Sequence, residues 1–106
     1  MVITDLEANI EYVNPAFVQS TGYSVKEALG QKASILKSGK NPSSMYRDLW
    51  GALLNGESWQ GEFINRREDG IELIEAAAIT PIKDAKGEPV NYIEAVSYTH
   101  LRAHET

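Results

Sequence analysis

An asparagine within a predicted strand is the side chain whose type and position most suggest binding chemistry. Residues 58–67 (SWQGEFINRR) alternate as a strand does, which puts Trp59, Phe63 and Asn65 on one face. Asparagine is depleted in strands, and an inward amide beside aromatic rings needs a hydrogen-bond partner. We expect that partner to be a ligand, a buried water or a neighbouring backbone group. Trp50, by contrast, lies on an apolar helical stripe, as a core tryptophan does.

The composition excludes several kinds of chemistry. The chain has 106 residues, a formal net charge of −5 and no cysteine. Without cysteine it cannot form a disulfide, a thiolate metal site, a cysteine nucleophile or a covalent flavin–cysteine adduct. The acidic balance argues against a nucleic-acid surface, and no apolar run approaches the roughly 18 residues of a membrane span. We therefore expect a cytoplasmic protein with one modest core and no metal site.

The last eleven residues, 96–106 (VSYTHLRAHET), break the pattern of what precedes them. This polar string resembles the conceptual translation of a sequencing adaptor, and we expect a non-native tail; a genuine C-terminal helix or tail is the alternative. Both histidines, His100 and His104, lie in it. The remaining chain then has no histidine for haem ligation, a catalytic triad or phosphorylation. We expect one domain over residues 1–95, cut short at its C-terminal end.

The first elements carry clear boundary signals. Short apolar runs at residues 2–4 and 10–13 flank a polar turn and predict a hairpin. Asn14-Pro15 then reads as an N-cap with proline at the first helical position, and Gly22 suits the end of that helix. Residues 24–27 (SVKE) form a capping box, which predicts a second, brief helix.

The strongest helix signal follows a connector over residues 31–41, in which Ile35 and Leu36 are expected to turn inward. Asn41-Pro42 predicts the start of this helix, and Asn55-Gly56 predicts its end. The apolar stripe of the helix consists of Tyr46, Leu49, Trp50, Leu53 and Leu54. The helix therefore presents one continuous apolar side to the rest of the fold.

The second half of the chain changes to the period of strands. Strands are predicted at residues 58–67, 71–82 and 90–95, with turns between them. The element order is thus two strands, about three helices and three strands. Such a chain can close one antiparallel sheet by placing the first pair beside the last three, with helices on one face. The predicted fold class is α+β.

Three blocks of the chain, residues 3–23, 38–70 and 79–93, resemble a PAS domain in their order and spacing. The resemblance implies a PAS-like (profilin-like) five-stranded antiparallel sheet. Members of the family sense a small molecule, light, oxygen or redox state in a cavity between sheet and helices. They relay the change through the sheet and a C-terminal linker to a histidine kinase, diguanylate cyclase or transcriptional output domain. The resemblance implies the sensory input module of a bacterial signalling protein; a ligand-free dimerisation module is the alternative.

Within this family the chain is most similar to PAS domains that hold FAD noncovalently in redox sensors. By that resemblance the indole of Trp50 would lie near the isoalloxazine ring, and the amide of Asn65 would bind its polar edge. Phe63 and Ile35 are the further candidates for the cofactor cavity. Ala33 stands where those domains place a carboxylate, so the resemblance leaves one polar group of that site unmatched.

The uncovered face of the sheet is the expected partner surface. In PAS domains this face commonly mediates a homodimer or contacts the output domain of the same chain, and Ile64, Ile74 and Ile79 would lie on it. Enzymatic activity is not expected. The chain before residue 96 has neither cysteine nor histidine, and it has no glycine-rich phosphate loop.

Overall fold

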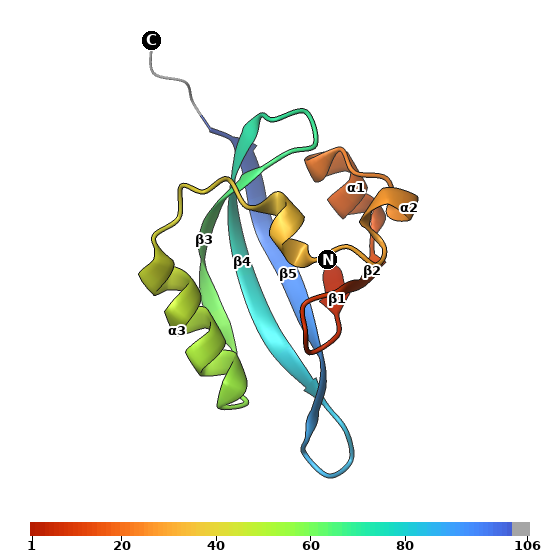
Figure 1. Cartoon of the computed structure of the whole chain (residues 1–106), viewed down its shortest axis with the longest axis vertical. Coiled ribbons are helices and arrows are strands. Elements are labelled where there is room, and N and C mark those ends of the chain that lie inside the picture. Colours follow the sequence, from red (N-terminus) through yellow and green to blue (C-terminus); the bar gives the residue numbers. More distant parts are fainter. Residues whose placement is uncertain (103–106) are drawn as a thin grey trace.

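One antiparallel sheet forms the body of the domain, and the helices pack against one of its faces (Figure 1). The computed structural model describes residues 1–102. In chain order its elements are β1 (Val2–Thr4), β2 (Ile10–Val13), α1 (Pro15–Thr21), α2 (Val25–Ala28), the 3₁₀ helix η1 (Ala33–Leu36), α3 (Ser43–Leu54), β3 (Trp59–Arg66), β4 (Glu72–Lys83) and β5 (Pro89–Leu101). The five strands lie in the order β2-β1-β5-β4-β3, so the N-terminal hairpin joins the last three strands through β1 and β5. The predicted α+β fold is confirmed.

The predicted boundaries of the first two helices are confirmed by their hydrogen bonds. Asn14 Oδ1 accepts from the Phe17 N–H at 3.0 Å, which caps α1. Gly22 ends that helix in the left-handed conformation, at φ 80°. Ser24 and Glu27 form the reciprocal bonds of a capping box at the start of α2. Each signal acts between residues that are close in sequence.

The start of α3 differs from the prediction. The helix begins at Ser43, and Asn41 does not cap it, because its amide is bound elsewhere. Asn41 Oδ1 accepts from the Ile64 N–H at 2.8 Å, and its Nδ2 donates to the Ile64 carbonyl at 3.0 Å. At the other end Leu54 is 77% exposed, so its place on the apolar stripe was wrong. Leu53, also predicted on the stripe, is buried as expected. Leu54 points away from it because consecutive helical residues point about 100° apart.

The last strand is longer than predicted. β5 continues through Leu101, six residues beyond the expected end at Ala95. The additional residues pair antiparallel with β4 from Ala77 back to Leu73, with a bulge between the pairs Ala77–Val96 and Ala76–Tyr98. This pairing consists of backbone hydrogen bonds, and it does not test where residues 96–106 come from. The predicted non-native origin of residues 96–106 therefore stays a prediction, and His104 lies outside the described residues.

Two buried clusters make up the core. The first joins β1, β2 and the N-terminal helices through Val2, Ile10, Val13, Phe17, Ala28 and Leu36. The second joins α3 to the sheet through Leu49, Leu53, Phe63, Ala77 and Tyr92. Within residues 1–102 no helix is long and apolar enough to cross a membrane. The two clusters meet around the cavity described below.

The two faces of the sheet separate the three isoleucines of the predicted partner surface. Ile64 and Ile74 are register partners on the outer face, away from the helices. Ile79 alternates with the buried Leu73 and Ala77 along β4, packs on the second core cluster and lines the cavity. The placement of Ile79 on the outer face was therefore wrong. A role of Ile64 and Ile74 in partner binding stays a prediction.

Candidate ligand-binding site

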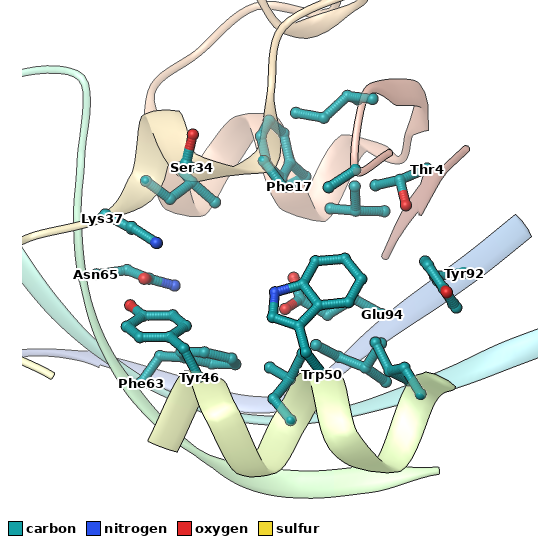
Figure 2. Close-up of a pocket in the computed structure, with 18 residues that line it drawn as sticks. Thr4, Phe17, Ser34, Lys37, Tyr46, Trp50, Phe63, Asn65, Tyr92 and Glu94 are labelled. Atoms are coloured by element: carbon teal, nitrogen blue, oxygen red, sulfur yellow. The ribbon is translucent and has the colours of Figure 1, made fainter. Parts of the chain in front are cut away.

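A cavity of about 180 Å³ lies between the inner face of the sheet, α3 and the N-terminal part of the chain (Figure 2). Most of its walls are apolar or aromatic. Its polar or charged lining residues are Thr4, Ser34, Lys37, Tyr46, Asn65, Tyr92 and Glu94. An apolar hollow with a few polar groups is the usual form of a small-molecule site.

Trp50 points from α3 into the cavity (Figure 2). Leu49 and Leu53, on the same side of the helix, are buried against the sheet and fix the rotation of α3. The indole meets the ring of Tyr92 edge-on, with 5.8 Å between the ring centroids. The helical stripe thus anchors α3 and supplies a cavity wall at the same time.

Asn65 is buried on β3, and its amide lines the cavity (Figure 2). Its Nδ2 donates to Glu75 Oε1 on the neighbouring strand at 3.0 Å. This partner is a carboxylate, which was not among the ligand, water or backbone partners that we expected. Within residues 1–102 the Oδ1 of Asn65 accepts no hydrogen bond, so the amide keeps one free acceptor at the cavity wall.

Aromatic rings line the cavity beside Asn65. Phe63 is buried, with its ring centroid 5.2 Å from that of Trp59 and 6.3 Å from that of Tyr46. Trp59 packs against Phe63 and does not line the cavity. The ammonium of Lys37 lies 4.2 Å from the centroid of the Tyr46 ring, in cation–π geometry. This end of the cavity is therefore both aromatic and positively charged.

Ile35 is the one sequence candidate that lies outside the cavity lining. The 3₁₀ turn η1 directs Ala33, Ser34 and Leu36 toward the cavity, whereas Ile35 packs against the first core cluster. The short helical turn spreads consecutive side chains in different directions, so they cannot all reach one cavity. Its position gives no support to a cofactor contact.

Glu94 is the cavity residue that sequence reasoning missed. It lies on β5, and this partly buried residue lines the same cavity as Trp50 (Figure 2). Burial raises the pKa of Glu94 to about 7; the negative charge of Glu75 adds to this rise, and the ammonium of Met1 opposes it. Within residues 1–102 the carboxyl makes no hydrogen bond or ion pair. Its alternation with the buried Tyr92 was the available signal, because residues two apart on a strand share a face.

Comparison with known proteins identifies the family. The family model described as "PAS domain" matches residues 1–98. A nitrogen fixation regulatory protein of Klebsiella oxytoca is 39% identical over 112 residues, which cover 98% of this chain and 23% of the relative. The aerotaxis receptor of Escherichia coli (strain K12) is 33% identical over 87 residues, covering 81% of this chain and 17% of the receptor. The chain thus spans less than a quarter of either relative.

Solved structures agree with this match. The light-state structure of the blue-light photoreceptor Aureochrome1 LOV has a TM-score of 0.84 and 27% identity, covering 91% of this chain and 77% of that chain. A light-oxygen-voltage domain studied with a flavin analogue has a TM-score of 0.83 and 26% identity, covering 96% of this chain and 76% of that one. The sheet order, the helices on one face and the cavity between them accord with these likenesses. This chain belongs to the PAS domain family.

Proposed function

We propose that this sensory module binds the ring of a flavin in its cavity and relays the state of that flavin to an output domain of its parent protein. PAS domains are sensory and non-catalytic, as was predicted for this chain. One of its structural relatives was studied with a flavin analogue. The observation that carries the proposal is the free acceptor of Asn65 in a largely apolar cavity that several aromatic rings help to line.

The residues present fit a flavin ring. Trp50, Phe63 and Tyr92 supply aromatic walls, and Asn65 Oδ1 can accept from an N–H at the edge of the ring. The bond from Asn65 Nδ2 to Glu75 fixes the orientation of the amide. A bound flavin would supply reversible redox chemistry that these side chains lack.

The size of the cavity limits which part of a flavin cofactor can lie inside it. About 180 Å³ is below the roughly 300–1,000 Å³ of common ligand pockets, so it suits a ring system better than a whole dinucleotide. If FAD is the cofactor, its adenosine diphosphate part has to lie outside the cavity. Ala33 lines the cavity without a polar group, as the resemblance led us to expect, and Glu94 brings a carboxyl into it from β5.

Reconstitution with flavin tests the proposal. The purified protein is incubated with riboflavin, FMN or FAD and desalted, and the retained flavin is measured by visible absorbance and by release on denaturation. Trp50→Ala and Asn65→Ala should each weaken binding by about tenfold, the value of one aromatic contact or hydrogen bond. Gln60→Ala, on the exposed outer side of β3, is the matched control and should bind as the unaltered protein does.

A protein that retains none of the three flavins would reject this function. The ligand-free dimerisation module would then be the better description. The interior is not fully packed, which favours a ligand.

We assign homodimer or output-domain contacts to the outer face around Ile64 and Ile74. Sedimentation of the protein and of Ile74→Lys checks this assignment, because only a dimer through that face is disrupted by the buried charge.

A further inference from the structure

We propose that Glu94 determines which ligand the cavity accepts: as a carboxylic acid, it donates a hydrogen bond to a neutral planar ligand that has an acceptor on the β5 side. The inference rests on the proposed function only in taking this cavity as the ligand site. It does not require the ligand to be a flavin.

The register partners of Glu94 in the sheet, Val2 on β1 and Ile79 on β4, are apolar, whereas Met1 and Glu75 line a second pocket together with Glu94. On β5 the residue alternates with the buried Tyr92, and its register partner on β4 is Ile79, which also lines the cavity. The carboxyl lines the same cavity as the indole of Trp50 (Figure 2). A carboxyl in such a place loses hydration and needs either a partner or a proton. Since it has no partner within residues 1–102, the proton is the available solution.

The charges around the cavity favour the protonated acid. Loss of hydration and the negative charge of Glu75 on β4 both oppose ionisation of Glu94, and they outweigh the Met1 ammonium next to β1, which favours it. Together they raise the pKa of Glu94 to about 7, so the acid and the carboxylate coexist near neutral pH. Lys37, the remaining charged group of the lining, stacks on the ring of Tyr46 and makes no ion pair with Glu94.

A ligand that fills this cavity removes water from the side of the carboxyl that faces it. The neutral acid then becomes more favourable, and its O–H can bind an acceptor of the ligand. Asn65 Oδ1 offers the complementary acceptor for a ligand N–H. The cavity thus suits a neutral heteroaromatic ring that carries both kinds of group, and binding takes up a proton. An organic cation is disfavoured by Lys37 in the same lining.

Riboflavin, a neutral flavin without phosphate, is the probe for this inference. Its dissociation constant is measured by fluorescence from about pH 6 to about pH 9. For the unaltered protein, affinity should fall up to tenfold per pH unit above the pKa of Glu94, because one proton is linked to binding. Glu94→Gln keeps a donor that does not titrate and should remove this pH dependence. Glu94→Leu removes the donor and should bind about tenfold more weakly at the acidic end.

The controls separate this inference from the proposed function. Glu62→Gln, at an exposed position on the outer side of β3, should keep the pH dependence of the unaltered protein. Equal pH profiles for Glu94→Gln and the unaltered protein, or affinity that rises with pH, overturn the inference. If no variant binds riboflavin, the flavin proposal fails, and NMR titration of the Glu94 carboxyl carbon decides the inference. A raised pKa in the free protein supports it, and an ordinary one rejects it.

Discussion

Replacing Gly61 with alanine should destabilise the domain, because the added methyl group would overlap the indole ring of Trp59. The indole of Trp59 covers Gly61 on β3, so an added Cβ would lie 3.0 Å from Trp59 Cζ3 and closer still to Cη2 and Cζ2. Real Cβ contacts are essentially never under 3.0 Å, and the rigid indole therefore has to rotate away. That rotation also breaks the contact of Trp59 with Phe63, whose ring centroid is 5.2 Å from that of the indole.

The expected loss of unfolding free energy follows from the surface area that the indole of Trp59 buries. A tryptophan buries roughly 150–250 Å², and exposing about half of it costs on the order of 2–3 kcal/mol at about 25 cal/mol per Å². Loss of the aromatic pair with Phe63 adds about 1 kcal/mol. Alanine recovers about 0.5–1 kcal/mol of backbone entropy relative to glycine. The free energy of unfolding of Gly61→Ala should therefore fall by about 2–3 kcal/mol.

Equilibrium urea unfolding measures this change, and Gly51→Ala is its matched control. Gly51 lies in α3 with nothing within 4 Å of an added Cβ, so the same substitution there should stabilise by about 0.5–1 kcal/mol. In a Trp59→Ala background, Gly61→Ala should lose its cost, since the overlapping ring is gone. Equal stability of the two glycine variants, or a cost that persists without the indole, would refute the reasoning.

Three other changes test separate parts of the fold. Leu53 is 2% exposed, so Leu53→Ala should lower the free energy of unfolding by about 2–5 kcal/mol. A decrease under about 1 kcal/mol in urea unfolding would contradict the core position of Leu53. Asn14→Ala removes the cap of α1 and should cost about 1 kcal/mol in the same assay, whereas no loss means that the cap bond is not stabilising. Glu94 has a folded-state pKa of about 7 against an ordinary 4.5, so its neutral form stabilises the protein fully below about pH 4.5, and this contribution is lost as pH rises through about 7. The loss is at most about 3 kcal/mol; Glu94→Gln should lack this part of the pH dependence of unfolding, and identical slopes for both proteins exclude it.

Signals that act over a few residues were readable from the sequence. The Asn14 cap, the Gly22 end and the Ser24–Glu27 box are each completed within one turn of helix, so the residue types alone define them. Strand alternation likewise placed Phe63 and Asn65 on the inner face of the sheet. The same alternation could have placed Ile79 and Glu94 there too.

Partners far apart in sequence were not readable. Asn41 looked like a helix cap, and only the folded chain brings it beside Ile64, 23 positions away. Asn65 has a carboxylate partner, Glu75, on the adjacent strand, and that pairing depends on the register of β3 and β4. The end of β5 depended in the same way on how much of β4 was left to pair. In each case the sequence shows the residue type but not the neighbour.

The bonds of Asn41 to Ile64 also bear on how the domain remains separate from other copies of itself. β3 is an outermost strand of the sheet. Free backbone groups on such an edge can pair with an extended segment of another molecule. The Asn41 amide occupies both the N–H and the carbonyl of Ile64, and the Ser38 hydroxyl donates to the same carbonyl. Beside them, Lys37 forms a backbone bridge to Asn65. The connector before α3 thereby blocks strand addition at the Ile64–Asn65 part of this edge.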